Sequence, residues 1–221
     1  MLDAIKAYNE AVLDTDRARA FQVVMDAIDR GVSPEDIVFN VVIPALDLMV
    51  KAIDQGFDTN LAQHFMTSQI AADVTEKMLQ LFKIPPEIVG RVVIGTAAGD
   101  LHTLGKRIVI GCLKAQMIDV IDLGVNVSAE KFVAEAVSKE AHVIGISAMM
   151  VHTARSEKGA IKVRKLLHEQ GLERKIKLVV GGAPFRYDTE LYSLVGADAW
   201  AENGVSALKV FMDCINEVKE Q

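Results

Sequence analysis

Residues 92–106 read VVIGTAAGDLHTLGK, a β-branched run that leads into a polar loop containing glycine. Residues 106–115 then place apolar side chains on one broad face of a helix. The loop is therefore predicted at the carboxyl end of a strand, where an open parallel sheet binds its ligand. Asp100 and His102 are close enough for the carboxylate to orient the imidazole, and Gly105 lets the backbone approach a bulky ligand.

Outward from this loop, strand-like and helix-like runs alternate from about residue 91 to the end. A helix is expected after each strand, and this alternation predicts an α/β fold with helices on both faces of a parallel sheet. Five strands are predicted, near 91–96, 119–123, 142–147, 176–181 and 198–201.

The part before residue 87 is predicted to be helical. Ser33 and Pro34 mark a helix start, as cap and first helical residue, and Pro44 is expected to kink its helix. The prolines in 84–87 cannot continue a helix, which predicts a boundary between domains 1–86 and 87–221. The first domain is expected to be a bundle of about four helices. Apolar residues recur at helical spacing at Phe21, Val24, Met25 and Ile28, and at Ile70, Val74, Met78 and Leu81.

Composition and charge exclude several classes of protein. The chain has 221 residues, 51% of them hydrophobic, which is ample for a packed core, yet no apolar run reaches membrane-spanning length. The net charge of −6 is concentrated in residues 1–87, which hold seven Lys or Arg against fourteen Asp or Glu. Neither part has the basic face of a nucleic-acid binder. With two distant cysteines and no signal peptide, a cytoplasmic protein without a disulfide framework is expected.

Three segments, each after a predicted strand, resemble the cobalamin-binding domain of B12-dependent methyltransferases and their corrinoid carrier proteins, to which a module of methionine synthase is related. The first, Gly99–Gly105, contains the pattern Asp-x-His-x-x-Gly. The second is Ser147–Thr153, and the third is Gly181–Ala183. An isolated Asp-x-His also occurs in metal hydrolases and structural pairs, so the ordered set carries the resemblance. The residues it places at the cofactor are Gly99, Asp100, Leu101, His102, Thr103, Leu104, Gly105, Ser147, Met149, Thr153, Gly181, Gly182 and Ala183.

The resemblance implies that residues 1–86 form a helical cap over the upper face of the corrin ring, and that a flavodoxin/Rossmann-like domain holds the lower face. The cofactor's own base leaves the cobalt, and His102 replaces it as the metal ligand. Asp100 and Thr153 complete the expected catalytic relay behind His102. Ser147, Met149 and the segment 181–183 match positions that line the channel for the cofactor's tail.

The sequence departs from the family pattern at four positions, namely Thr103, Leu104, Met149 and Val151. Leu104 and Met149 conserve volume, whereas Val151 stands where a hydroxyl is frequent, which removes a hydrogen bond available to the tail. Ser147 and Thr153 have an alternative use as caps of the next helix. His64, Phe65 and Met66 are candidates to face the cobalt, although a bundle core uses such residues too.

Two functions fit this reading. The first is a methyl carrier that accepts a methyl group from a substrate-specific methyltransferase and presents it to a second one, which methylates a pterin or thiol. Catalysis then requires the partner enzymes. The second is a cobalamin-dependent sensor, a class whose light-sensing members place a Trp above the cobalt, whereas the single Trp here is Trp200. A flavodoxin-like domain with another ligand is a more remote choice. The sequence does not distinguish methanol, methylamines, methoxylated aromatics or betaines as the methyl source.

Overall fold

The computed structural model describes residues 1–46, 48, 61–82 and 87–220, apart from the side chains of 61, 64 and 205. By contacts the chain divides into two units, one of Met1–Glu87 with Gly111–Met117 and one of Ile88–Ile110 with Ile118–Gln221. The predicted boundary between 86 and 87 stays a prediction, because residues 83–86 lie outside the described part. The side chain of His64 also lies outside it.

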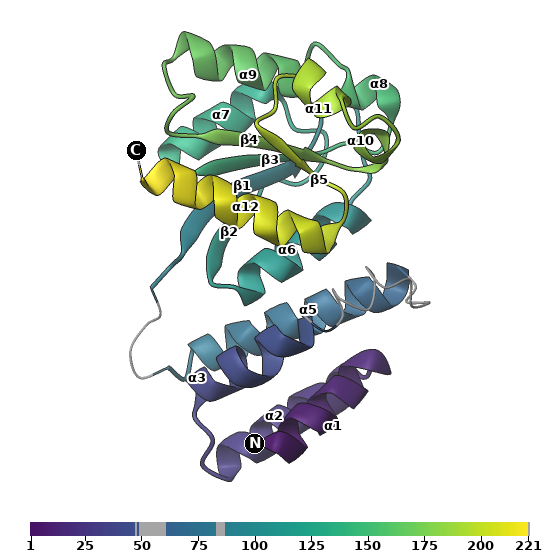
Figure 1. Ribbon diagram of the computed structural model, residues 1–221, viewed down its shortest axis with the longest axis vertical. Coiled ribbons are helices and arrows are strands. Elements are labelled where there is room, and N and C mark those ends of the chain that lie inside the picture. The colour runs from purple at the N-terminus through teal and green to yellow at the C-terminus, as the bar shows by residue number, and fades with distance from the viewer. Residues whose placement is uncertain (47, 49–60, 83–86, 221) are drawn as a thin grey trace. The chain divides into compact units, whose positions relative to one another are not determined.

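The first unit is helical, as predicted (Figure 1). Ser33 caps α3 by accepting a hydrogen bond from the backbone N–H of Asp36, with Pro34 at the first helical position. Val24, Ile70, Val74 and Met78 are buried, but Leu81 is exposed because its helix has already ended. The helices of this unit are α1 (Leu2–Leu13), α2 (Arg17–Asp29), α3 (Pro34–Ile37), the π-helix η1 (Val38–Val42) and α5 (Leu61–Leu79).

Pro44 follows a π-helical turn. The N–H of Ile43 donates to the carbonyl of Val38, five residues earlier, instead of to a residue four earlier. Proline lacks an N–H, and its ring crowds the carbonyl of the preceding turn in a regular α-helix. The disturbance predicted at Pro44 therefore takes the form of a widened turn just before it.

The second unit is a doubly wound α/β domain with one parallel sheet in the order β2-β1-β3-β4-β5. Each predicted strand is present within two residues of its expected bounds. The strands are β1 (Gly90–Thr96), β2 (Ile118–Asp122), β3 (Val143–Ser147), β4 (Lys177–Gly181) and β5 (Ala199–Ala201). The helices are α6 (Leu104–Ala115), of which residues 104–110 belong to this unit, α7 (Ala129–Ser138), α8 (Val151–Ala154), α9 (Ala160–Glu169), α10 (Ala183–Tyr187), α11 (Leu191–Leu194) and α12 (Gly204–Lys219).

Helices cover both faces of the sheet (Figure 1). Phe132 of α7 packs against Gly95 of β1, while Phe211 of α12 packs against Gly145 of β3 on the other face. The core that includes residues of α7, α9 and the sheet is made of buried Ala, Val, Ile, Leu and Phe side chains. In the described residues, no helix has the length and apolarity needed to cross a membrane.

The strand order changes direction between β1 and β3. From β1 the chain moves to one side to form β2, then returns to the other side of β1 to form β3. Parallel pairing aligns Thr96 with Ser147, so the loops after these two strands emerge side by side. This is the switch point at which open α/β sheets bind ligands, and it lies at the predicted loop.

Candidate functional site

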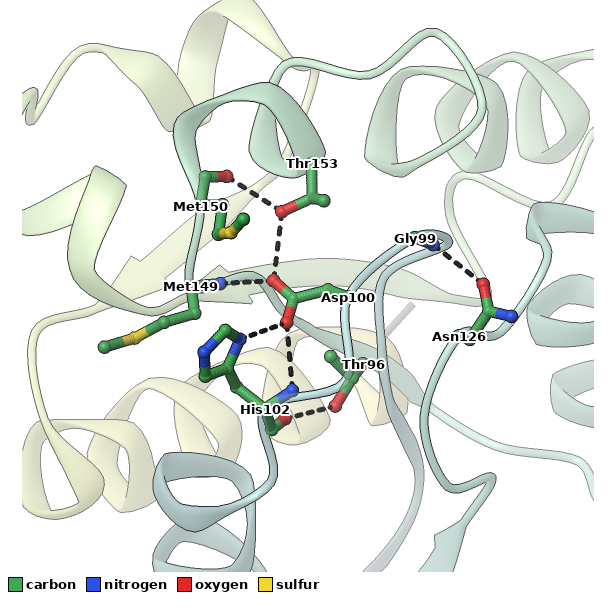
Figure 2. A network of polar contacts seen from close by, with 8 residues as sticks. All are labelled: Thr96, Gly99, Asp100, His102, Asn126, Met149, Met150 and Thr153. Carbon is green, nitrogen blue, oxygen red and sulfur yellow. Dashed lines mark hydrogen bonds and ion pairs between the residues drawn. The ribbon is translucent and has the colours of Figure 1, made fainter.

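Asp100 and His102 form a close pair in the loop between β1 and α6 (Figure 2). One carboxylate oxygen, Oδ1, lies 2.7 Å from Nδ1 of His102 and accepts a hydrogen bond from the backbone N–H of His102 at 3.0 Å. The Asp100 side chain is 0% exposed, whereas the imidazole is 57% exposed. The buried carboxylate therefore fixes one edge of the ring and leaves Nε2 directed away from Asp100.

The loop after β3 supplies the partners of the other carboxylate oxygen, as Figure 2 shows. Oδ2 of Asp100 accepts from the backbone N–H of Met149 at 2.7 Å and lies 3.0 Å from Oγ1 of Thr153. Oγ1 is also 2.8 Å from the carbonyl oxygen of Met150. Because a hydroxyl has one proton, Thr153 donates to only one of these oxygens at a time. The structure thus brings together the three residues of the expected relay.

Thr153 and Ser147 do not cap the next helix. Met150 is the N-cap of α8, with no side-chain capping bond, and Thr153 lies inside that helix. Ser147 is the last residue of β3. The capping alternative is therefore wrong for both hydroxyls.

Hydrogen bonding sets the charge of Asp100. Burial alone would raise the pKa of its carboxyl, but donors on His102, Met149 and Thr153 outweigh burial and hold this pKa well below its ordinary value. An ionised carboxylate only accepts, so Nδ1 of His102 carries the proton that it shares with Asp100. In the neutral ring, Nε2 then has a free lone pair, which is the form that binds a metal.

A cavity of about 120 Å³ lies beside this loop, between the carboxyl ends of the central strands and helices α6 and α12. Of the residues predicted to line a channel, Ser147, Gly181 and Gly182 line it, as does Gly105. Met149 and Ala183 are not among its lining residues.

The surface around His102 is apolar. Its side chains come from the loop after β1, the start of α6 and the loop after β3, and they include three of the positions at which the sequence departs from the family pattern. They are 41% to 69% exposed, and they are Leu101, Leu104, Met149, Met150 and Val151. Thr103 is exposed as well.

Sequence reasoning missed three polar residues that hold this loop. Thr96 donates through Oγ1 to the carbonyl of His102 at 3.0 Å. Asn126 accepts from the N–H of Gly99 through Oδ1 at 2.8 Å. Lys106, buried in the first turn of α6, donates to the carboxylate of Asp122 and to the carbonyl of Gly124. A signal existed for Lys106 alone, since a lysine amid the apolar residues of a helix start is unusual.

Known proteins resemble this chain over most of its length. The family model described as B12 binding domain matches residues 90–209. Dimethylamine corrinoid protein 3 of Methanosarcina acetivorans is 31% identical over 192 residues, covering 84% of this chain and 86% of that protein. Trimethylamine corrinoid protein 1 of Methanosarcina mazei is 28% identical over 210 residues, covering 93% and 94%.

Solved structures show the same fold. A cobalamin-binding protein from Desulfitobacterium hafniense has a TM-score of 0.74 at 20% identity, covering 95% of this chain and 98% of that one. The methanol:cobalamin methyltransferase complex MtaBC from Methanosarcina barkeri gives a TM-score of 0.79 at 23% identity, covering 99% of this chain and 84% of that one. Because the family model matches more than half of this chain, the chain belongs to the B12 binding domain family.

Proposed function

We propose that this protein is a corrinoid protein that binds cobalamin through His102, with the cofactor's own base displaced, and shuttles a methyl group between two methyltransferases. The observation that carries the proposal is the half-exposed imidazole, oriented by a fully buried carboxylate at the switch point of the sheet. The names of the relatives, trimethylamine and dimethylamine corrinoid proteins, support a carrier over a sensor.

The residues around His102 fit a corrin ring. A corrin presents a broad, largely apolar face around its metal, and the exposed apolar side chains described above surround the imidazole in the same way. Gly105 adds a second indication, because a Cβ built on it would meet no atom of the described residues within 4 Å, its chain neighbours and its own helix backbone aside. Protein packing therefore does not explain this glycine, whereas a ligand lying close to the backbone does.

A bound cobalamin would supply a cobalt ion able to carry a methyl group. His102 would hold that ion through Nε2. Asp100 would orient the ring through the Nδ1 proton, which would lie closer to the carboxylate while Nε2 donates to a metal and return fully to Nδ1 when Nε2 is free. Thr153 would offer a further hydrogen bond to the carboxylate oxygen that His102 does not use, in alternation with its bond to the carbonyl of Met150.

The cavity lined by Ser147, Gly181 and Gly182 is the proposed channel for the cofactor's tail. Gly182 has a φ of +118°, and a Cβ on it would lie 2.0 Å from the carbonyl oxygen of Ala148. This glycine keeps the β3 and β4 loops close together at the channel mouth. Residues 99–105 complete the proposed contacts on the ring side.

The proposed partners are a substrate-specific methyltransferase and a second enzyme that passes the methyl group to a pterin or thiol acceptor. We assign no nucleic-acid or membrane partner. Residues 1–86 are proposed as the cap that limits access of water to the cofactor and opens for these partners. A cytoplasmic location suits the two free cysteines, Cys112 and Cys214, both buried.

The test is to reconstitute the full chain with hydroxocobalamin and follow cobalt methylation by ultraviolet-visible spectroscopy with candidate methyltransferases. Methylation by a methylamine or methanol methyltransferase, followed by transfer to a second enzyme, is the expected result. A chain that stays colourless after incubation with hydroxocobalamin and gel filtration would contradict the proposal.

A further inference from the structure

Lys106 is a buried cation in the first turn of α6, four residues after His102. Its side chain is 1% exposed. A buried ammonium costs several kcal/mol unless it is paired. The first turn of a helix is also the end at which the helix dipole disfavours positive charge. Neither the core nor the helix therefore favours lysine at this position. Lys106 also lines the cavity beside the loop, but its ammonium is bound by protein groups, so its role is argued from what Nζ binds.

Nζ of Lys106 binds the end of β2 and the loop after it. It pairs with the carboxylate of Asp122 and donates to the carbonyl oxygen of Gly124 at 2.9 Å. The same Asp122 oxygen accepts from the N–H of Gly124 at 2.9 Å. One ammonium thus fixes residues 122–124 against the start of α6.

Residues 122–126, called here the support segment, contact the His102 loop directly. The carbonyl of Gly124 accepts from the N–H of Thr96 at 3.0 Å. The backbone N–H of Asn126 donates to the carbonyl of Asp100 at 3.0 Å, and Oδ1 of Asn126 accepts from Gly99 at 2.8 Å (Figure 2). The support segment therefore holds the backbone of Asp100, whereas Met149 and Thr153 hold its side chain.

We propose that Lys106 is a positioning residue for His102, acting through the support segment on the backbone of Asp100. The proposal rests on the proposed function, in which His102 ligates cobalt. The chain offers a comparison in Arg164, which likewise donates to a carboxylate, Asp198, and to a backbone carbonyl, that of Gly196. Arg164 binds at the amino-terminal ends of strands β4 and β5, whereas His102 follows the carboxyl end of β1. Loss of the Arg164 side chain is therefore expected to lower stability without changing ligation by His102.

The experiment measures axial ligation and fold stability separately. The full chain is labelled uniformly with ¹⁵N, loaded with unlabelled hydroxocobalamin and reduced to the Co(II) form for electron paramagnetic resonance. A protein nitrogen splits the cobalt lines into doublets, whereas the cofactor's own ¹⁴N base gives triplets. Lys106→Met and the matched control Arg164→Met are compared with the wild type, alongside urea unfolding.

We expect Lys106→Met to retain bound cofactor but to weaken ligation by His102 about 10-fold, the lower end of what groups behind a metal ligand contribute. The doublet signal falls accordingly. Arg164→Met loses stability to urea but keeps the wild-type doublet. An unchanged doublet in Lys106→Met overturns the proposal. So does a Lys106→Met protein that binds less cofactor but shows full His102 ligation of the cofactor it still binds. A wild type without the doublet refutes His102 ligation itself, which separates the two failures.

Asn126 provides a second test if Lys106→Met does not fold. Its φ of +52° suits glycine, so Asn126→Gly removes Oδ1 without backbone strain. Asn126→Asp keeps the acceptor for Gly99. A doublet that is weaker than the wild type's in Asn126→Gly and recovers in Asn126→Asp supports the proposal. Doublets of wild-type strength in both variants overturn it.

Discussion

Asp100 and His102 differ sharply in exposure, at 0% and 57% of their side chains. Removing the half-exposed imidazole leaves no large internal cavity, while removing the carboxylate takes the acceptor from the donors of His102 and from the N–H of Met149. The two members of the pair should therefore respond differently to substitution, one mainly in ligand binding and the other in stability as well.

His102→Ala should keep the fold and lose the axial nitrogen. We expect a changed spectrum of the bound oxidised cofactor and weaker retention, with stability lowered by only about 1–3 kcal/mol for one hydrogen bond to a charged group. Absorption spectra and equilibrium dialysis provide the measurement. His168→Ala is the matched control, since His168 is another exposed histidine paired with a carboxylate, Glu173. Equal spectra and affinities for wild type and His102→Ala would exclude the ligand assignment.

Asp100→Asn should make stability less dependent on acid pH. The pKa of Asp100 is lowered in the folded state, so its contribution is complete above the unfolded value of about 3.9 and is lost as the pH falls toward the folded value. The stability difference between wild type and Asp100→Asn should therefore stay constant from about pH 7 to about pH 5 and shrink as the pH falls below about 4. Urea unfolding across this range measures it, with Asp119→Asn as a control carboxylate. A stability difference between the two proteins that does not change with pH would contradict the lowered pKa of Asp100 in the folded state.

At the scale of elements, two glycines occupy opposite situations. Gly105 lies in the first turn of α6, where a Cβ would meet no side chain or neighbouring element in the described part of the chain. Gly182 caps α10 with a positive φ, and a carbonyl oxygen occupies the place of a Cβ. The described residues leave space beside Gly105 for a side chain. At Gly182 the positive φ of the backbone requires glycine.

Gly105→Ala should stabilise the cofactor-free protein by about 0.5–1 kcal/mol, because alanine is the better helix former. The same change should weaken cobalamin binding if the ring lies over this position. Gly182→Ala should destabilise the protein by at least about 1–3 kcal/mol from strain. Urea unfolding and cobalamin titration of both variants check these signs, and unaltered cobalamin affinity in Gly105→Ala would argue against the ring lying there.

At the scale of the whole molecule, folding and cofactor binding are linked. A ligand that binds only the folded state stabilises it by about 2.7 kcal/mol at about 100 times its dissociation constant. Hydroxocobalamin should therefore raise the thermal midpoint of the full chain, and do so less for His102→Ala at the same concentration. Scanning calorimetry tests this, and equal shifts in the two proteins would show that His102 contributes nothing to binding.

Features that depend on neighbouring residues could be predicted from the amino-acid sequence. Alternating strand and helix patterns predicted all five strands within two residues, because periodicity is local. The pairing of Asp100 with His102 was equally accessible, since two residues of loop bring them within hydrogen-bond reach. The order of the strands and the π-helical turn before Pro44 were not predictable in this way.

Long-range strand pairing selects the distant groups that complete the site. Met149 and Thr153 reach Asp100 across 49 and 53 residues because β1 and β3 pair in parallel, with Thr96 opposite Ser147. Lys106 finds Asp122 across the β1–β2 pairing. A lysine or threonine looks the same in sequence whether its partner is water or a buried carboxylate. That choice is made by the packing of the whole sheet, which brings residues far apart in the chain into contact.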